Sequence, residues 1–343
     1  MRILAVGDSY MPSRYFAQAF TGLDATHEIG YHQVDEATPL RPSTPSELKL
    51  REYQGSPEQI AQRMSEVEVL VVHGAPVTDQ VLDASSALRL VCCARGGPVN
   101  IDVEAVTARG LRLVNTPGKN AEAVADLTLA FLVMLARGLP KAQRFLEEGH
   151  RLRDNWEGAR FMGSDLRRHV LGLVGYGQIG RRVAERAVAF GMAILVYDPY
   201  LQVDRFEQVE TLDELLGRAD FVSLHARATA ENQNMIDARA LAAMKPGAFL
   251  VNTARETLVD EDALDAALAS GRLGGAALDV VRGDEAEGRH QLLRHENVVL
   301  TPHLGGATHE TLLQGAEMIA EEIVRFAAGE PLVNVVNRTA VAV

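Results

Sequence analysis

A glycine-rich segment in the middle of the chain has the spacing of a phosphate-binding turn. Gly175, Gly177 and Gly180 form a GxGxxG pattern between the apolar run VLGLV and the amphipathic segment RRVAERAVAF. In such a turn the first glycine permits a tight bend, the second lets backbone amides approach a pyrophosphate, and the third allows close helix–strand packing. The helix N-terminus that follows favours the phosphate charge. The pattern therefore predicts a dinucleotide-binding site.

The residue at the end of the next apolar run indicates which dinucleotide fits. The run ILVYD ends in Asp198, whose carboxylate can accept hydrogen bonds from both hydroxyls of an adenosine ribose. Because the same carboxylate repels a 2′-phosphate, the sequence predicts NAD rather than NADP. Arg181 and Arg182 stand close by and leave NADP open as the alternative.

Four more polar residues follow apolar runs later in the chain, namely His225, Arg255, Asp279 and His303. Ligands of open α/β sheets bind at the carboxyl ends of the strands, where all four are expected. Arg255 offers a planar fork suited to a carboxylate, with a surface ion pair as the alternative. The imidazole of His303 can exchange a proton near pH 7, although a single histidine is more often structural.

Short β-branched runs alternate with helix-like segments along nearly the whole sequence, which is typical of parallel sheets with crossover helices. The predicted fold class is α/β. We expect strands over Arg2–Gly7, Glu28–Val34, Val67–His73, Leu88–Ala94 and Leu111–Asn115, and helices over Pro57–Val67 and Asp102–Arg109. From Val170 onward, six strand-like runs suit a doubly wound nucleotide-binding sheet, and a last helix is expected over Thr308–Phe326.

A long apolar helix is expected from Asn120 to Arg137. Asn120 suits the N-cap, and Gly138 and Pro140 are stop signals. Apolar residues occur all round this helix, so it must be buried on several sides. Two interpretations stay open, a core helix within one domain and a helix packed in a subunit interface.

Composition and charge exclude several classes of protein. The chain of 343 residues is long enough for two domains, and its 34 basic against 46 acidic residues give a net charge of −12. A surface this acidic argues against general binding to nucleic acid or to an anionic membrane. Since the sequence has neither a signal-peptide pattern nor a long enough apolar stretch to cross a bilayer, a cytoplasmic protein is expected.

The only two cysteines, Cys92 and Cys93, are adjacent in a strand-like run. Neighbouring side chains in a strand point to opposite faces, so two buried thiols are expected rather than a disulfide or a catalytic thiol.

A set of longer motifs extends over nearly the whole chain. In order, these are ARGGPVNID, NTPGKNAEAVADLTLAFLVMLAR, LGLVGYGQIG, VSLHARAT, MKPGAFLVNTARE, GGAALDV and NVVLTPHLGGAT. With them the chain resembles the D-isomer-specific 2-hydroxyacid dehydrogenase family, in its phosphoglycerate dehydrogenase-like short form. With the tail ending at Val343, the regulatory domain of the long phosphoglycerate dehydrogenases is not expected.

This resemblance implies two Rossmann-like or flavodoxin-like domains with parallel sheets, the cofactor domain being inserted into the substrate domain. The substrate-binding domain is expected over 1–118 and 306–343, and the NAD-binding domain over 119–305. The resemblance also implies a homodimer through the helix after Asn120. The expected partners are a small acid and a second copy of the chain, without nucleic acid or membrane.

The implied activity is a reversible hydride transfer between nicotinamide and C2 of a 2-hydroxy or 2-oxo acid. Arg255 then grips the substrate carboxylate, and His303 is the acid–base, oriented by a carboxylate after the GGAALDV strand. The residues implied for the cofactor NAD are Gly175, Tyr176, Gly177, Gln178, Ile179, Gly180, Asp198, His225, Thr253, Ala254 and Asp279. Those implied for the substrate are Arg95, Gly96, Gly97 and Arg255, and no metal site is expected.

Some positions depart from the family pattern. The usual Glu-Pro after the aspartate strand is missing, and Asp284 is predicted to be the partner of His303 because it holds the equivalent position after Asp279. Glu285 has the longer side chain but not the register, and it stays the alternative. Glu256 replaces the usual glycine after Arg255, and the substrate itself stays open, with a sugar acid and a phosphorylated acid as candidates.

A second class of function also fits this fold. A branch of the family consists of NAD-sensing corepressors or scaffolds, and turnover of NADH distinguishes an enzyme from such a binding protein. Formate dehydrogenase is similar in fold but has a Gln-Pro approach to its histidine, whereas this chain has Thr301-Pro302-His303.

Overall fold

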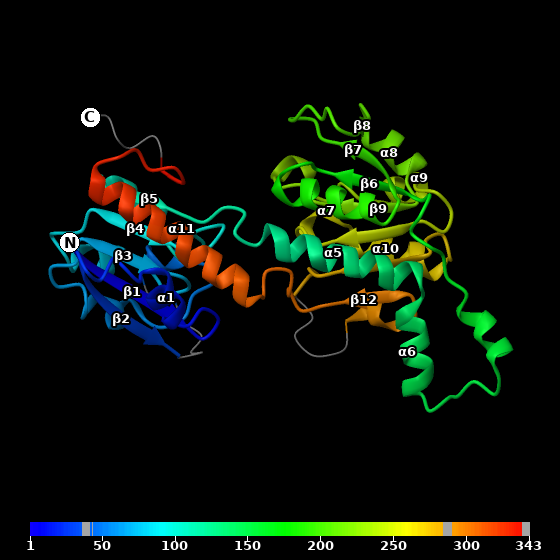
Figure 1. Cartoon of the computed structure of the whole chain (residues 1–343), viewed down its shortest axis with the longest axis horizontal. Coiled ribbons are helices and arrows are strands. Elements are labelled where there is room, and N and C mark those ends of the chain that lie inside the picture. The colour runs from blue at the N-terminus through cyan, green and yellow to red at the C-terminus, as the bar shows by residue number, and fades with distance from the viewer. Residues whose placement is uncertain (36–41, 43, 284–289, 338–343) are drawn as a thin grey trace. The chain divides into compact units, whose positions relative to one another are not determined.

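The computed structural model describes residues 1–343 except 36–41, 43, 284–289 and 338–343. The chain divides into two compact units (Figure 1). Unit 1 comprises Met1–Lys119 and Thr308–Val343, and unit 2 comprises Asn120–Ala307. Each unit contains one parallel sheet. The predicted α/β class with parallel sheets is confirmed.

Unit 1 is built on a five-stranded sheet whose order is β2-β1-β3-β4-β5. All neighbouring strands are parallel, and this order is that of flavodoxin-like sheets. Its strands are β1 (Arg2–Asp8), β2 (Glu28–Val34), β3 (Val69–Val72), β4 (Leu90–Cys93) and β5 (Arg112–Val114). Its helices are α1 (Arg14–Ala19), α2 (Pro57–Ala61), α3 (Asp79–Asp83), α4 (Val103–Ala108) and α11 (His309–Ala328), with the 3-10 turn η1 (Glu47–Lys49).

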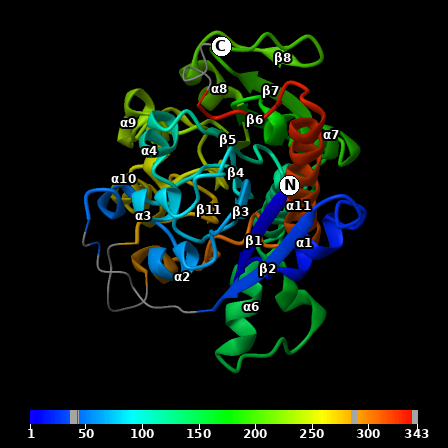
Figure 2. The ribbon, with the colours of Figure 1, turned by 90° about the vertical axis from the view of Figure 1, so that its left-hand side faces the viewer.

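Both faces of this sheet are buried, which explains why β3 and β4 consist only of apolar residues and cysteine. One face packs under α1 and α11, which lie next to each other in Figure 2. Cys92 faces this side, and Cys93 faces the opposite core. Both thiols are free and fully buried, which confirms the prediction for the cysteine pair.

Unit 2 is built on a seven-stranded parallel sheet whose order is β12-β11-β10-β9-β6-β7-β8. This is the doubly wound nucleotide-binding order with an added edge strand. Its strands are β6 (Val170–Val174), β7 (Ala193–Tyr197), β8 (Glu207–Gln208), β9 (Phe221–Leu224), β10 (Phe249–Asn252), β11 (Gly275–Leu278) and β12 (Val298–Leu300). The helices are α5 (Ala121–Ala136), α6 (Leu139–Glu147), α7 (Gln178–Ala189), α8 (Leu212–Arg218), α9 (Ala238–Ala243) and α10 (Glu261–Ala269). The 3-10 turns are η2 (Asn155–Phe161), η3 (Ala230–Asn232), η4 (Glu256–Leu258) and η5 (Gln291–Arg294).

The long apolar helix α5 is buried mostly within its own unit. Its residues share a core cluster with α7 and with strands of the sheet. On its outer side, Glu122 forms ion pairs with Arg182 and Arg186 of α7, and Asp126 lies 2.7 Å from Arg186. The interpretation as a core helix therefore accounts for the apolar residues of α5. Asn120 stands at the N-cap as predicted, but its side chain makes no capping hydrogen bond.

The structure corrects the sequence prediction at the helix after Ser56 and at one edge of the second sheet. The helix expected over 57–67 ends at Ala61, because the hydrogen bonds of Arg63, Met64 and Val67 reach back only three residues and form turns. The strand β8 was not predicted, since two polar residues at a sheet edge have no apolar alternation.

Among the described residues, no single helix has the length and apolar composition needed to cross a membrane; only α5 and α6 taken together pass that test, and the pair is bent by 69°.

Candidate active site

The glycine-rich turn joins β6 to α7, and two of its glycines are required by close backbone contacts. Gly175 has a φ of +97°, and a Cβ there would lie 2.8 Å from the backbone nitrogen of Ala226. A Cβ on Gly180 would lie 2.4 Å from the carbonyl oxygen of Gly175. A Cβ on Gly177, by contrast, would meet no described atom within 4 Å. The space in front of Gly177 is therefore open to a ligand.

The N-terminus of α7 has the properties of an anion site. Gly177 is its N-cap residue, and no side chain caps the amides of the first turn. That turn contains Gln178, Ile179 and Gly180, which were predicted to line the cofactor. Uncapped amides and the helix dipole both favour a phosphate. The turn thus fits the pyrophosphate of a dinucleotide.

Asp198 lies directly after β7 and holds the glycine-rich turn. Its Oδ2 accepts a hydrogen bond from the backbone of Tyr176 at 2.8 Å. Its Oδ1 accepts from the amides of Tyr200 and Leu201 at 2.9 and 3.1 Å. Since a carboxylate has about four lone-pair positions and three are used here, Asp198 keeps acceptor capacity for a further hydrogen bond, such as that from a ribose hydroxyl.

The two arginines that left NADP open are both engaged within unit 2. Arg182 forms an ion pair with Glu122 of α5. Arg181 donates to the carbonyl of Tyr176 at 3.2 Å, and its guanidinium lies 5.4 Å from the centre of the Tyr176 ring. The charge of Arg182 is therefore matched by a carboxylate, whereas Asp198 has no cationic partner within 4.0 Å among the described residues.

His225 follows β9 and lies against the glycine-rich turn. Its Cβ would be 3.8 Å from a Cβ on Gly180. Its Nε2 is 2.9 Å from Oγ of Ser223, while its buried Nδ1 has no hydrogen-bond partner among the described residues. Burial lowers the pKa of His225 to about 3, so the ring is neutral at pH 7. An unpartnered buried nitrogen at this place fits a polar group of a bound dinucleotide.

The residues after β10 are held in place by short hydrogen-bonded contacts. Oγ1 of Thr253 is 3.0 Å from Oγ1 of Thr128 on α5. The amide of Ala254 donates to Oδ1 of Asn252 at 3.0 Å. Arg255 comes next, and its Nη1 donates to the carbonyl of Ala254 at 2.6 Å.

The side chain of Arg255 is exposed, and no carboxylate of the described residues lies within 4.0 Å of its guanidinium. A surface ion pair, the alternative weighed from the sequence, is therefore absent from the part of the chain that the structure describes. The guanidinium keeps free N–H groups in the fork geometry that matches a carboxylate.

His303 stands on a loop after β12 that the Asp279 carboxylate fixes. Asp279 is buried at the end of β11 and accepts hydrogen bonds from Thr301 Oγ1 at 2.5 Å, from the Leu304 amide at 2.6 Å and from the Gly305 amide at 2.7 Å. Within this loop His303 has a φ of +58°, a left-handed conformation that is uncommon outside glycine. The loop thus presents an exposed imidazole at the carboxyl edge of the sheet.

The predicted partner of His303 lies outside the described residues. Asp284 and its alternative Glu285 both belong to the segment 284–289. Asp279 was predicted to contact the cofactor, but both of its oxygens hold the loop of His303. Sequence reasoning did not identify this role, which depends on the contact between two strand ends.

Parallel strands bring the predicted residues of unit 2 to one edge. The turn after β6, Asp198 after β7, His225 after β9, Arg255 after β10 and Asp279 at the end of β11 all stand at carboxyl ends. His303 follows β12 at the same edge. This is the edge at which open α/β sheets bind ligands.

In unit 1, the residues predicted for the substrate follow β4. Gly96 and Gly97 are exposed, and the carbonyl of Gly96 accepts a hydrogen bond from Asn115 at 2.8 Å. Arg95 forms an ion pair with Glu52. A cavity of about 430 Å³ lies elsewhere, at the amino ends of β4 and β5 beside Arg89, Arg112 and Phe326. It is therefore at the opposite end of the sheet from these residues.

Three polar residues near the carboxyl ends of unit 1 were missed by sequence reasoning, namely Asp8, His73 and Lys119. Asp8 ends β1 and His73 follows β3, so the rule applied to the second sheet would have found both. Lys119 comes five residues after β5, in the turn before α5, and does not stand directly at a strand end.

Fold and site together define a class: a chain of two α/β units, one of which carries a dinucleotide turn with an arginine and a histidine at the same sheet edge. The sequence profile described as "D-isomer specific 2-hydroxyacid dehydrogenase, NAD binding domain" matches residues 129–305. The chain belongs to the D-isomer-specific 2-hydroxyacid dehydrogenase family. The prediction of an NAD-binding domain, made from the glycine-rich turn, is confirmed.

Known proteins of this family are similar over most of the chain. A D-3-phosphoglycerate dehydrogenase from Methanocaldococcus jannaschii is 38% identical over 286 residues, which cover 82% of this chain and 53% of that protein. A glyoxylate reductase from Korarchaeum cryptofilum is 40% identical over 293 residues, which cover 84% of this chain and 88% of that protein. The structure of D-2-hydroxyisocaproate dehydrogenase superposes with a TM-score of 0.81 at 25% identity and covers 98% of this chain and 99% of that one. The chain spans about half the length of the D-3-phosphoglycerate dehydrogenases it matches.

Proposed function

We propose that the chain is an NAD-dependent D-2-hydroxyacid dehydrogenase that interconverts a 2-hydroxy acid and the corresponding 2-oxo acid. The observation that carries the proposal is the exposed imidazole of His303, which stands on a loop fixed by Asp279 at the same sheet edge as the dinucleotide turn. The sequence left a buried structural histidine as the alternative, and the exposure of His303 argues against it.

Each proposed residue has one task. Bound NAD supplies the hydride acceptor for oxidation, and NADH the hydride donor for reduction. Arg255 binds the substrate carboxylate through its free N–H groups. Gly96 and Gly97 of unit 1, which are exposed, are proposed to bind substrate through their backbone amides. In reduction His303 donates a proton to the alkoxide oxygen, and in oxidation it accepts the proton of the hydroxyl.

The orientation of His303 is proposed to depend on two carboxylates. Asp279 fixes the loop backbone, and Asp284 accepts a hydrogen bond from the ring, with Glu285 as the alternative partner. A carboxylate beside the imidazole stabilises its protonated form, which suits a proton donor. The domain functions are part of the proposal: unit 2 binds NAD, and unit 1 binds the rest of the substrate.

We infer a preference for NAD over NADP from Asp198. Its carboxylate is set at the end of β7 and would repel a 2′-phosphate. Of the two arginines that left NADP open, Arg182 is paired with Glu122, and Arg181 lies against the ring of Tyr176.

The test is a screen of 2-oxo acids with NADH and with NADPH, followed by the variant His303→Asn. Asparagine tolerates the left-handed conformation of position 303, so the loop should keep its shape while the proton donor is lost. We expect NADH to be oxidised with higher kcat/KM than NADPH, and the variant to lose roughly a hundredfold or more in kcat with NADH affinity retained.

A matched control is His150→Gln, an exposed histidine of unit 2 away from the sheet edge, which should leave turnover unchanged. Near wild-type turnover of His303→Asn would remove the proposed proton donor. Binding of NADH without reduction of any 2-oxo acid would instead favour an NAD-sensing binding protein.

A homodimer and a cytoplasmic location complete the proposal. The sequence placed the interface at α5, whose apolar residues are mostly buried within unit 2. The apolar side chains exposed on α6 and the segment after it support an interface there instead. The location rests on the sequence alone.

A further inference from the structure

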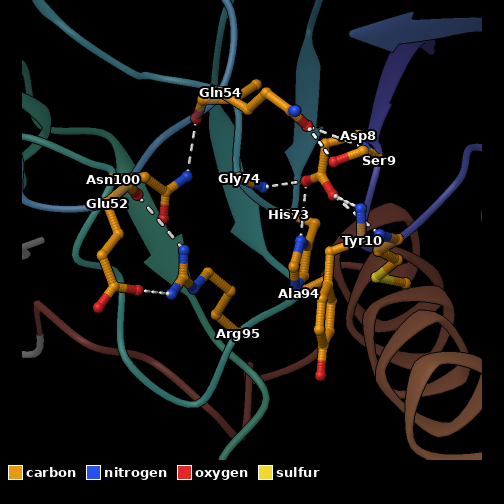
Figure 3. Close-up of polar contacts among 12 residues, drawn as sticks. Asp8, Ser9, Tyr10, Glu52, Gln54, His73, Gly74, Ala94, Arg95 and Asn100 are labelled. Carbon is orange, nitrogen blue, oxygen red and sulfur yellow. Dashed lines mark hydrogen bonds and ion pairs between the residues drawn. The ribbon is translucent and has the colours of Figure 1, made fainter. Parts of the chain in front are cut away.

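The cavity of about 430 Å³ in unit 1 has no task in the proposed function. It lies at the amino ends of β4 and β5, whereas Asp8, His73 and Arg95 lie at the carboxyl ends of strands in the same sheet (Figure 3). Residues before β4, residues at the start of β5 and the C-terminal end of α11 line it. All of its lining residues belong to unit 1, so the cavity is formed by one unit alone.

Two arginines of the cavity, Arg89 and Arg112, stand next to each other and face the same helix. The amide of Arg112 donates to the carbonyl of Arg89 at 3.5 Å. The guanidinium of Arg89 lies 4.9 Å from the centre of the Phe326 ring on α11. Arg112 is in register with Leu90, which belongs to the core cluster under α11, and paired residues of parallel strands point to the same face. Both guanidinium groups are therefore on the α11 side of the sheet.

Neither of these guanidinium groups is paired with an acid. Among the described residues, no carboxylate lies within 4.0 Å of Arg89 or Arg112, and neither side chain donates a hydrogen bond. Arg109, a third arginine that lines the cavity, behaves differently, because it lies 2.8 Å from Asp79 and 2.7 Å from Asp83. The cavity thus contains two adjacent guanidinium groups whose N–H donors are free, in a chain whose net charge is −12.

Two negative features border the cavity, and neither cancels these charges. Glu330 lines it, but its carboxylate lies 3.7 Å from Arg325 and more than 4.0 Å from the two free guanidinium groups. The negative end of the α11 dipole is equivalent to about half an elementary charge. One of the last carbonyls of that helix, on Arg325, is also used, because it accepts the amide of Glu330 at 2.8 Å. The lining residues therefore keep an excess of positive charge.

Adjacent free guanidinium groups indicate the charge and shape of a ligand. Each presents its N–H donors in a fork that matches a pair of anionic oxygens. A phosphate monoester carries close to two negative charges at pH 7 and three strong acceptor oxygens, which is enough for both forks. A single carboxylate has one charge and two oxygens.

The size and the apolar walls of the cavity indicate that the ligand has an organic part. A volume of about 430 Å³ lies within the range of roughly 300–1,000 Å³ that is typical of sites for small organic molecules. Leu88, Leu111 and Phe326 line the cavity beside the arginines. An inorganic anion would leave these side chains without a contact.

We propose that this cavity binds a small organic phosphate monoester, with Arg89 and Arg112 holding the phosphate and Leu88, Leu111 and Phe326 contacting the organic part. The site is separate from the candidate active site, because it lies at the end of the unit-1 sheet opposite to Gly96 and Gly97. It also shares no residue with the carboxyl edge of the sheet in unit 2. The inference does not rest on the proposed function.

The test uses phosphate esters that lack a carboxylate and a nucleobase, so that neither Arg255 nor the dinucleotide turn is expected to select them. Glucose 6-phosphate and glycerol 3-phosphate are titrated into the full chain by calorimetry at constant ionic strength, because salt screens exposed charges. Glucose 6-sulfate has the same organic part with one charge less, glucose has no charge, and malonate is a dicarboxylate. We expect glucose 6-phosphate to bind about tenfold or more tightly than glucose 6-sulfate, and glucose not to bind.

Variants assign the binding to its residues. Arg89→Gln and Arg112→Gln should each weaken binding of glucose 6-phosphate by about tenfold or more, because charge-assisted hydrogen bonds are lost. Arg112→Lys keeps the charge but not the fork, so its affinity should lie between those of wild type and Arg112→Gln. Glu330→Gln removes a negative charge from the lining and should tighten binding. The matched control is Arg63→Gln, which removes an exposed arginine of unit 1 outside the cavity and should leave the affinity unchanged.

Four results would overturn the proposal. These are no binding of either phosphate ester at millimolar concentration, equal affinity for glucose 6-phosphate and glucose 6-sulfate, binding that both glutamine variants of the cavity leave unchanged, and an equal loss in Arg63→Gln. Tighter binding of malonate that the cavity variants abolish would replace the phosphate ester by a dicarboxylate. Melting temperatures show which variants fold, and if one arginine variant does not, the other decides together with Glu330→Gln. Since no turnover is measured, failure of the proposed dehydrogenase activity leaves this result intact.

Discussion

At the scale of single residues, His225 shows how burial beside the dinucleotide turn sets the charge of a side chain. The folded chain keeps its ring neutral because burial lowers the pKa of His225 from 6.5 to about 3. In the unfolded chain the ring titrates near its ordinary value. Below that pH the His225 ring binds a proton in the unfolded state but not in the folded state, so the free energy of unfolding decreases.

We therefore expect the free energy of unfolding to be fully present above about pH 6.5 and to fall as the pH is lowered toward 3. The His225 contribution to this loss between pH 7 and pH 5 should be about 2 kcal/mol. Urea unfolding at both pH values checks it: His225→Gln should flatten the dependence, and His150→Gln should not. His73 also has a lowered pKa, but it is present in the wild type and in both variants, so its contribution cancels when they are compared. An equal pH dependence in wild type and His225→Gln would contradict this assignment.

At the scale of elements, the turn between β6 and α7 contains glycines that are needed for two different reasons. Gly180 is required by packing, because a Cβ there would lie 2.4 Å from the Gly175 carbonyl. A Cβ on Gly177 would meet no described atom within 4 Å, so packing within the fold does not require glycine there. Glycine at this position instead leaves room for a ligand to approach the backbone.

The variants Gly180→Ala and Gly177→Ala should therefore behave differently. Gly180→Ala forces the helix away from the turn and should cost about 1–3 kcal/mol of stability. Gly177→Ala should cost less than about 1 kcal/mol in stability, yet weaken NADH binding by roughly tenfold or more, because its methyl group occupies the phosphate position. Chemical unfolding and NADH titration of both variants measure the two effects. Loss of stability in Gly177→Ala with unchanged affinity would mean that the turn does not hold the pyrophosphate.

Elements were predictable from the sequence where burial on both sides leaves an unbroken apolar run. The fully buried strands β3 and β4 lie within longer predicted runs. The edge strand over Glu28–Val34 was also predicted, with its observed ends, although most of it is not buried. The helix predicted to continue beyond Ala61 fails because its apolar spacing is equally compatible with a series of turns. The short helix α6 begins at Leu139 with a proline in its first turn, where the sequence was interpreted only as a stop signal.

The site was predictable wherever a motif ties residues together along the chain, as in the turn from Gly175 to Gly180. The anchoring of the His303 loop by Asp279 was not, because it joins two strand ends 22 or more residues apart. The contact of Lys119 with Ala94 likewise depends on strand order and on a glycine in α11, neither of which local sequence shows.

At the scale of the whole molecule, each unit has its own hydrophobic cores. The clusters around β1 and β3 contain only residues of unit 1, and those around β6 and β9 contain only residues of unit 2. The exposed apolar side chains are distributed unevenly: α6 buries none of its residues, and Leu146, Trp156 and Met162 are 54%, 88% and 82% exposed. In Figure 1, α6 and the following segment extend from the sheet of unit 2.

Such a concentration of apolar surface on a chain with a net charge of −12 needs a partner that is itself apolar there. A second copy of the chain offers the same segment, as a two-fold interface requires. We therefore expect a dimer in light scattering coupled to size exclusion, and expect Trp156→Ser together with Leu146→Ser to shift it toward monomer by removing large apolar contacts. The matched control is Tyr200→Ser, an aromatic residue of unit 2 that is 90% exposed outside this segment and should leave the dimer intact. A wild-type monomer at micromolar concentration, or a dimer unaffected by the double substitution, would show that this surface does not mediate assembly.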